Sequence, residues 1–189
     1  AAYEGSLSIA KTLRAHGINV NCAPMCDLRF AGSHSIIGDR AYGTEPLQVS
    51  ALARSVAQGL LDGGVLPVIK HIPGHGRATA DSHESLPIVT ASISELQEDF
   101  APFKALADLP LAMTAHILYT AIDPALPATL SPKVIRTIRE EIGFNNLLMS
   151  DDLCMKALKG SPASLARQTL NAGCDLVLHC NGEIEAMEE

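Results

Sequence analysis

The segment 71–90 contains a carboxylate and an imidazole whose types and spacing suit proton transfer. Asp81 and His83 are two residues apart, so in an extended backbone their side chains lie on the same side. A hydrogen bond from an imidazole to a carboxylate fixes the imidazole tautomer and raises its basicity. The segment holds two prolines and three histidines, and a loop of about 20 residues in a compact domain is usually functional. Asp81 and His83 are therefore a candidate acid/base pair.

A candidate nucleophile follows a different part of the chain. Asp151 and Asp152 come directly after the apolar segment 146–150. Two adjacent aspartates could simply begin a helix, where a carboxylate caps the free N–H groups, and we assign that role to Asp152. Asp151 is the first residue past a buried strand, so we expect it to point into the mouth of the fold, where a desolvated charge indicates chemistry.

Alternating apolar and amphipathic segments are expected to position these residues. The apolar segments are short and rich in branched side chains, which is typical of strands covered on both faces of a parallel sheet. We predict strands at 18–23, 65–70, 111–115, 146–150 and 175–179, and helices at 3–16, 46–62, 93–107, 132–142 and 163–172. Nothing along the chain marks a linker, so residues 1–189 are predicted to be one α/β catalytic domain.

Ionisable residues follow four of the five predicted strands. The loop after the first strand contains Asp27 and Arg40, the second strand leads into Lys70 and His71, the third into His116, and the fourth into Asp151. The carboxyl ends of parallel strands meet at one rim, which forms the binding face of such folds. We therefore expect the site at this rim.

The overall composition excludes some classes of function. The net charge is −7 with acidic and basic residues interspersed, so nucleic acid is not an expected partner. The apolar runs are of strand length, so no membrane-spanning segment and no association with a membrane are expected. The chain has five cysteines, and the closest pairs have the spacings C-x3-C and C-x5-C. These spacings match no common zinc pattern, so we expect reduced thiols and a cytoplasmic location.

Six short blocks, in order and spacing, resemble glycoside hydrolase family 3, and specifically its bacterial cytoplasmic β-N-acetylglucosaminidases of cell-wall recycling. Ile72 stands where phenylalanine is more usual in that family. The blocks are Ile37-Gly38-Asp39-Arg40, Lys70-His71-Ile72-Pro73-Gly74-His75-Gly76, Asp81-Ser82-His83, Ala115-His116, Pro127-Ala128-Thr129-Leu130-Ser131 and Ser150-Asp151-Asp152-Leu153.

The resemblance implies a TIM-type (β/α)8 barrel, of which the five predicted strands would be the third to the seventh. It also implies that the family's first two strands and its last strand are absent from the 189 residues, so that the barrel domain is incomplete at both ends. An incomplete barrel would expose apolar strand edges.

The resemblance further implies roles for individual residues. Asp151 would be the nucleophile of a retaining glycosidase, and His83, held by Asp81, would replace the usual second carboxylate as acid and base. The family's sugar-binding residues match three further positions, Arg40, Lys70 and His71. The implied reaction is removal of terminal β-linked N-acetylglucosamine from GlcNAc-anhydroMurNAc muropeptides, with neither metal nor other cofactor. The oligomeric state is left open.

Two alternatives remain at this point. The compact set His71, His75, Asp81 and His83 could instead bind zinc in a metal-dependent hydrolase, although an H-x3-H spacing in a loop differs from helical zinc motifs. The absent segments also leave room for a sugar-binding remnant without catalytic activity.

Overall fold

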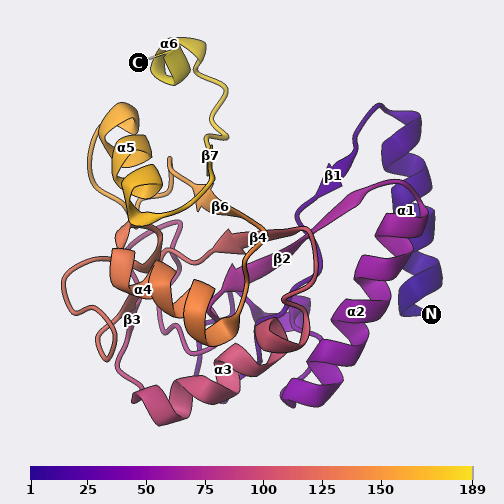
Figure 1. Ribbon diagram of the computed structural model, residues 1–189, viewed down its shortest axis with the longest axis horizontal. Helices are drawn as coiled ribbons and strands as arrows, with labels where there is room; N and C mark the ends of the chain where they lie inside the picture. Colours follow the sequence, from indigo (N-terminus) through magenta and orange to yellow (C-terminus); the bar gives the residue numbers. More distant parts are fainter. Residues whose placement is uncertain (189) are drawn as a thin grey trace.

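The fold is built around a five-stranded parallel sheet with the order β1-β2-β4-β6-β7. The computed structural model describes residues 1–188, apart from the side chain of Ala186. Figure 1 shows the strands as an open, curved sheet. Its strands are β1 (Val20–Asn21), β2 (Leu66–Ile72), β4 (Leu111–Thr114), β6 (Leu147–Asp152) and β7 (Leu176–Leu178). All five predicted strands are therefore present, in parallel, in the order in which the chain makes them.

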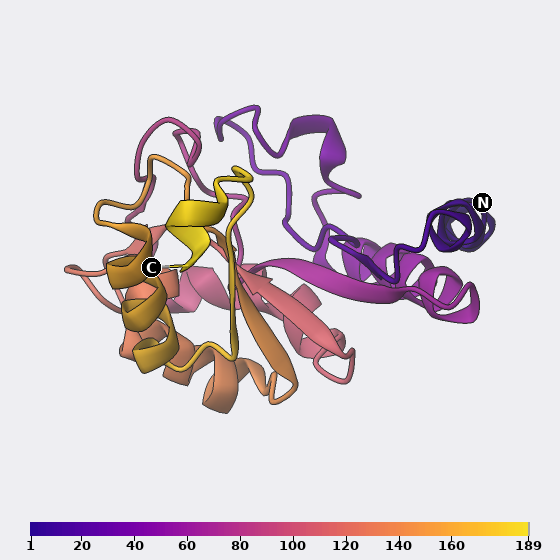
Figure 2. The same ribbon diagram turned by 90° about the horizontal axis from the view of Figure 1, so that it is seen from above.

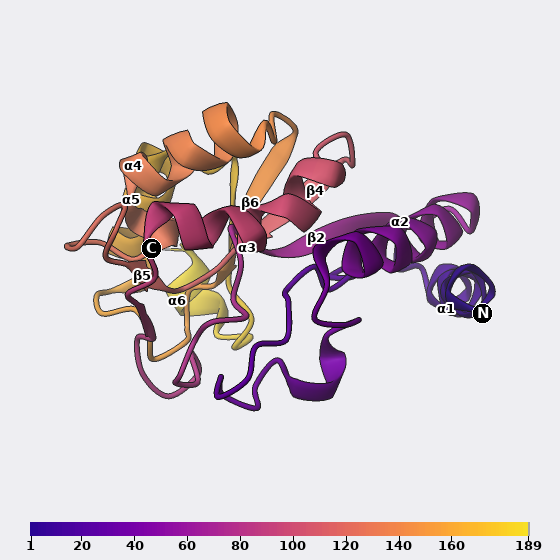
Figure 3. The same cartoon turned by 90° about the horizontal axis from the view of Figure 1, so that it is seen from below.

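Helices separate the strands along the chain, as predicted. Figures 1 and 3 show α2, α3 and α4 in an arc along one side of the strands. The helix predicted at 132–142 begins as an α-helix and continues to Ile142 as a π-helical segment. The helices are α1 (Ala2–Ala15), α2 (Pro46–Asp62), α3 (Ile93–Ala105), α4 (Pro132–Arg136), α5 (Pro162–Ala172) and α6 (Ile184–Glu188).

Local sequence signals set the helix ends. Ser92 accepts a hydrogen bond from the backbone N–H of Glu95, whose side chain returns one to the backbone of Ser92, which makes a capping box at the start of α3. Gly173 ends α5 at φ 113°, a left-handed conformation that glycine adopts without steric cost. These ends lie within two residues of the predicted ones because their determinants are local.

Apolar side chains cover both faces of the sheet. The main core packs between the strands and the helices, with Phe100, Phe103 and Ile69 fully buried within it. A smaller cluster on the opposite face contains Val68 and Met113. Burial on both faces explains why the strands are apolar along their length instead of alternating.

Two strands continue past their predicted ends, and both extensions carry site residues. β2 continues through His71 to Ile72, where it pairs with Thr114 of β4, and β6 continues through Asp152. Pairing with a neighbouring strand extends each ladder past the apolar run that marks it in the sequence. His71 and Asp151 are thus held by the sheet and do not belong to loops.

The loop between β2 and α3 is tied to its surroundings at both ends. Its last part forms β3 (Ile88–Val89), which pairs in parallel with β5 (Leu118–Tyr119) in a separate two-stranded sheet. Near its start, the Tyr119 hydroxyl donates to the Gly74 carbonyl at 2.7 Å. Figure 2 shows the loops after β1, β2 and β6 rising on the same side of the sheet, as the rim prediction requires. Among the helices described, none is long and apolar enough to cross a membrane.

Candidate active site

The site is organised around a fully buried carboxylate, Asp27, in the loop after β1. Its two oxygens accept hydrogen bonds from the backbone N–H of His71 at 3.2 Å and of His75 at 2.6 Å. The Nδ1 atom of His71 lies 2.7 Å from Asp27 Oδ2. One carboxylate therefore fixes both the turn from His71 to His75 and the imidazole ring at its start.

Charge and burial oppose one another at Asp27. Burial alone would raise the pKa of the carboxyl, but His71, and then His75, stabilise the anion and the net pKa lies below the ordinary 3.8. An ionised carboxylate can only accept hydrogen bonds, so Nδ1 of His71 carries the hydrogen. The other ring nitrogen of His71, Nε2, is left facing the rim.

His71 links Asp27 to the predicted nucleophile. Its Nε2 atom lies 3.8 Å from Oδ2 of Asp151, whose side chain is 17% exposed. The other oxygen of Asp151, Oδ1, accepts a hydrogen bond from the backbone N–H of Asp152 at 2.9 Å. Asp151 thus has one anchored oxygen and one that faces the rim beside an imidazole, which is an arrangement suited to attack on a bound group.

The helix cap predicted at Asp152 is wrong. The Asp152 carboxylate accepts hydrogen bonds from the backbone N–H groups of Cys154 and Cys180, each at 3.0 Å. A turn follows β6, and α5 begins only at Pro162, where Ser161 caps it. The carboxylate holds together the chain ends after two neighbouring strands, a partnership that adjacency in the sequence cannot reveal.

Asp81 and His83 form the hydrogen-bonded pair that their spacing suggests. His83 Nδ1 lies 2.8 Å from Asp81 Oδ1, which also accepts the backbone N–H of His83 at 2.8 Å. That backbone hydrogen bond, with the imidazole beside it, lowers the pKa of Asp81. Since Nδ1 faces a carboxylate, Nε2 is free to exchange a proton, and the His83 side chain is 61% exposed.

The loop that carries Asp81 and His83 contacts the loop that follows β6, the strand in which Asp151 lies. The backbone N–H of Ala157, in the loop after β6, donates to the carbonyl of Ser82 at 3.2 Å. Ser82 is the residue between Asp81 and His83. Among the described residues, no hydrogen bond or ion pair joins the acid/base pair to Asp151 directly. The shared contact through Ser82 places the two groups on the same rim.

His75 is buried and contacts the loop that carries Asp81 and His83. It is 3% exposed, and its Nε2 lies 3.3 Å from the Ser82 hydroxyl, whereas Nδ1 is buried with no hydrogen-bond partner among the described residues. Burial, with His71 nearby, lowers the pKa of His75 to about 4, so the ring is neutral near pH 7. The neutral imidazole of His75 therefore contacts the residue that lies between Asp81 and His83.

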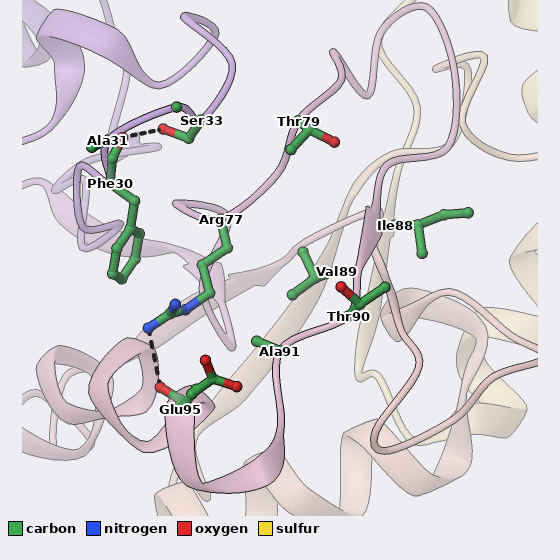
Figure 4. A pocket seen from close by; sticks show the side chains of 11 residues that line it. Phe30, Ala31, Ser33, Arg77, Thr79, Ile88, Val89, Thr90, Ala91 and Glu95 are labelled. Atoms are coloured by element: carbon green, nitrogen blue, oxygen red, sulfur yellow. Dashed lines mark hydrogen bonds between the residues drawn. The ribbon is translucent and has the colours of Figure 1, made fainter.

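Arg77 anchors the start of the same loop to α3. Its Nε donates to Asp99 at 2.6 Å, and its guanidinium lies 4.0 Å from the centre of the Phe30 ring. Burial raises the pKa of Asp99 to about 6, even though Arg77 lowers it. Figure 4 shows Arg77 reaching across a cavity of about 560 Å³ between Phe30 and Glu95. The ion pair therefore ties the start of the loop to α3.

The predicted sugar-binding residues differ in their placement. His71 lies in the cluster, and Lys70 precedes it in β2, half-buried. Arg40 is exposed, and its guanidinium donates to the carbonyl of Ile36 in its own loop at 2.9 Å and 2.5 Å. The structure thus brings His71 close to Asp151, and the sugar-binding roles of Arg40, Lys70 and His71 stay predictions.

His116 is buried and does not present a free group at the rim. Its Nε2 faces the Asp152 carbonyl at 2.9 Å and its Nδ1 the Thr129 hydroxyl at 2.7 Å. Burial lowers the pKa of His116, and a neutral ring that donates from Nε2 and accepts at Nδ1 satisfies both contacts. His116 therefore supports the end of β6.

The four residues of the zinc alternative are divided between two hydrogen-bonded groups in the structure. His71 and His75 are held at Asp27, while Asp81 and His83 pair with one another in the exposed part of the loop. Within residues 1–188, no group of three or more histidine, cysteine, aspartate or glutamate side chains is arranged to hold a metal ion. This geometry does not support the zinc alternative.

Comparison with known proteins identifies the family. The model of the glycosyl hydrolase family 3 N-terminal domain matches residues 1–189. The chain belongs to glycosyl hydrolase family 3. The predicted partial TIM-type barrel, with an open parallel sheet and outer helices, is confirmed.

Relatives and solved structures agree with this assignment. The chain is 41% identical over 186 residues to a β-hexosaminidase of Nitrosomonas eutropha, covering 95% of the chain and 53% of that protein. A β-hexosaminidase of Alkalilimnicola ehrlichii is 44% identical over 179 residues, 92% of the chain and 51% of that protein. The chain thus spans about half the length of these curated relatives.

A solved structure of the same family contains a bound sugar analogue. The crystal structure of NagZ from Neisseria gonorrhoeae in complex with N-trifluoroacetyl-D-glucosamine superposes with a TM-score of 0.89 at 36% identity, covering 99% of the chain and 55% of NagZ. A family 3 β-N-acetylglucosaminidase from Paenibacillus sp. str. FPU-7 gives a TM-score of 0.90 at 37% identity, over 94% of the chain and 35% of that enzyme.

The buried carboxylate at the centre of the site was missed as a functional residue in the sequence. The sequence shows Asp27 only as part of a long polar loop. One signal could have found it, since it directly follows the apolar pair Met25-Cys26 at the carboxyl end of the first strand region, the position at which Asp151 was recognised. Ser82 stands within the Asp81-Ser82-His83 block, and nothing in the sequence marks its contact with His75.

Proposed function

We propose that the protein to which this chain belongs is a retaining glycoside hydrolase that removes terminal β-linked N-acetylglucosamine. The observation that carries the proposal is the rim arrangement in which Asp151 lies beside His71 while the His83–Asp81 pair stands on the adjoining loop. Family membership supports the chemistry. One similar structure is that of a β-N-acetylglucosaminidase, and another contains an analogue of N-acetylglucosamine.

The proposed first step uses both groups. A carboxylate oxygen of Asp151 forms a bond to the anomeric carbon, and the bond from that carbon to the leaving oxygen breaks. His83 gives its Nε2 proton to the leaving oxygen, while Asp81 stabilises the imidazolium that provides it. The product is a covalent glycosyl ester on Asp151 and a free aglycone.

The second step reverses the proton transfer. A water oxygen attacks the anomeric carbon, His83 Nε2 accepts the proton of that water, and the ester bond to Asp151 breaks. An imidazole suits both steps because its ordinary pKa of about 6.5 is close to neutral pH. His71, whose ring orientation is set by Asp27, would hydrogen-bond a sugar hydroxyl beside Asp151, together with Lys70 and Arg40.

The finer assignment concerns the natural substrate. We propose muropeptide fragments in which N-acetylglucosamine is linked to anhydro-N-acetylmuramic acid, hydrolysed in the cytoplasm. The sequence blocks quoted above support this substrate. All five cysteines are free thiols in the structure, which is compatible with a reducing compartment.

Covalent trapping tests the proposed nucleophile. The full-length protein would be incubated with a 5-fluoro N-acetylglucosaminyl donor, digested and analysed by mass spectrometry. The sugar should be found on Asp151, the label should be lost in Asp151→Asn, and it should stay on Asp151 in the neighbouring control Asp152→Asn. A label on any other residue would refute the assignment. Absence of turnover and label in the wild-type protein would favour the sugar-binding remnant.

A further inference from the structure

Two of the five cysteines are exposed, and both lie where the chain leaves neighbouring strands. Cys154 follows β6 and Cys180 follows β7. The other three are less accessible, since Cys22 is half-buried and Cys26 and Cys174 are buried. Burial raises the pKa of Cys174 to about 12, and it raises the pKa of Cys26 as well. Cys154 and Cys180 are therefore the thiols that a reagent in solution would reach first.

The sheet brings these two cysteines to the same position along neighbouring strands. Asp152 of β6 pairs in parallel with Leu178 of β7, and each cysteine lies two residues beyond its member of this pair. The backbone N–H of Leu153 donates to the Leu178 carbonyl at 2.9 Å, so the pairing continues past Asp152. Neighbouring strands lie about 4.8 Å apart. A disulfide needs Cα atoms that are about 4.4–6.8 Å apart, so this spacing suits one.

One carboxylate oxygen holds the two cysteines together. Asp152 Oδ1 accepts the backbone N–H of Cys154 and that of Cys180, each at 3.0 Å. Two nitrogen atoms that each lie 3.0 Å from one oxygen are at most twice that distance, 6.0 Å, from each other. The Asp152 carboxylate thus fixes the separation of the two backbones independently of the strand pairing.

The Cys154 thiol lies against the backbone of Cys180. Partial burial raises the pKa of this thiol above its ordinary 9.0, and the backbone N–H of Cys180 opposes the rise. An N–H group stabilises a thiolate in this way only within hydrogen-bond range. Burial, and then the Asp152 carboxylate, raise the pKa of the Cys180 thiol. Both thiols are therefore mainly protonated near pH 7, and their reaction with an oxidant should be faster at higher pH.

We propose that Cys154 and Cys180 are a redox-sensitive dithiol, a modification site at which a low-molecular-weight disulfide closes a bridge between the ends of β6 and β7. One protein thiolate attacks a sulfur of the oxidant, forms a mixed disulfide and releases one small thiolate. The second protein thiolate attacks the protein sulfur of that mixed disulfide and releases the other small thiolate. Two protein thiols are thus oxidised, one small disulfide is reduced to two thiols, and these take up the two protons.

The bridge would act on the strand that carries the candidate nucleophile. Asp151 lies in β6, three residues before Cys154. In the reduced protein, hydrogen bonds to Asp152 join the two cysteine backbones, whereas the oxidised protein would have a covalent bond there. A bond that closes the segment 154–180 restricts the unfolded chain and so stabilises the fold. The bridge joins two elements of the fold, so it would form whether or not the protein hydrolyses sugars.

Disulfide mapping of the full-length protein tests the modification site. The protein would be reduced, freed of reductant, incubated with oxidised glutathione at about pH 8.5 and then alkylated. Digestion with trypsin and chymotrypsin separates Cys174 from Cys180, because Leu176 and Leu178 lie between them. Mass spectrometry should find Cys154 linked to Cys180, and dithiothreitol should release the link. A bridge between any other pair, or glutathione adducts on both cysteines without a bridge, would overturn the proposal.

Single variants and thermal unfolding test what the bridge does. Cys154→Ser and Cys180→Ser should each abolish the bridge and leave a glutathione adduct on the remaining exposed cysteine. Cys22→Ser is the matched control and should keep the bridge. Oxidation should raise the midpoint of thermal unfolding by about 5 °C or more in the wild type and in this control, but not in the other two variants. A bridged wild type with an unchanged or lower midpoint, or an equal rise in Cys180→Ser, would contradict the proposal.

Discussion

Replacing Asp27 by Asn perturbs the carboxylate on which the site is built. The substitution keeps the size of the side chain and removes its charge. One carboxylate oxygen becomes an NH₂ group, which can donate a hydrogen bond but cannot accept one. If the remaining oxygen keeps the backbone N–H groups of His71 and His75, the NH₂ group must face His71 Nδ1. His71 would then carry its hydrogen on Nε2, toward Asp151.

The cost follows from the hydrogen bonds that change. Three donor groups, two backbone N–H groups and one imidazole, lose an ionised acceptor in a fully buried site. Hydrogen bonds to a charged group contribute about 1.5–3 kcal/mol each and neutral ones about 0.5–1.5, so a loss of about 1 kcal/mol per bond gives a destabilisation of roughly 2–4 kcal/mol. The Michaelis constant should also rise, because Nε2 of His71 would carry the hydrogen and could no longer accept a hydrogen bond from a sugar hydroxyl.

The effect should depend on pH with a definite sign. The pKa of Asp27 is lower in the folded protein than its ordinary 3.8, so its carboxylate stabilises the fold above that value, and this contribution is lost as the pH falls through the folded-state pKa. The difference in unfolding free energy between wild type and Asp27→Asn should therefore be full at pH 7 and smaller near pH 3.

Chemical denaturation of the full-length protein at several pH values measures this difference. Asp39→Asn is the matched control, since that carboxylate is fully exposed and should change the free energy of unfolding by less than about 0.5 kcal/mol. An Asp27→Asn protein as stable as the control at pH 7, or one with the same loss at pH 3 and pH 7, would contradict the reasoning.

Three further changes test other parts of the site. In steady-state assays, His83→Ala should slow the hydrolysis of substrates with poor leaving groups about a hundredfold or more, and that of activated aryl glycosides much less, because only poor leaving groups need a proton. Equal losses of rate on both kinds of substrate would show that His83 is not the acid. His75 is held neutral with a pKa of about 4, below the ordinary 6.5, so stability should fall by roughly 3 kcal/mol as the pH drops from 6.5 to 4. In His75→Gln, the free energy of unfolding measured by chemical denaturation should depend less steeply on pH between 6.5 and 4. An unchanged pH dependence would contradict this explanation. Arg77→Met should lower unfolding free energy by about 3 kcal/mol, because Asp99 would lose its buried partner; a neutral effect in the same assay would show that the ion pair does not hold the loop.

Much of the fold could be predicted because its determinants are local. Apolar runs of strand length, separated by helices with a serine at the N-terminus or a glycine after the end, indicated the parallel sheet. The Asp81–His83 pair was predictable for the same reason, since two residues of extended chain bring the side chains together. The rim position of Asp151 followed from the rule that parallel strands share one carboxyl edge.

Contacts between distant residues were decided only by the tertiary structure. Asp27 reaches His71 and His75 across 44 and 48 residues, and the Asp152 carboxylate accepts the backbone N–H of Cys180, which is 28 residues away. Ser82 meets Ala157 because the loops after β2 and β6 rise on the same side of the sheet. The periodicity of apolar residues indicates which face of a helix or strand is buried. The partner of a polar group depends instead on which loops the sheet brings together. That placement decided that Asp27 holds the His71 imidazole beside Asp151.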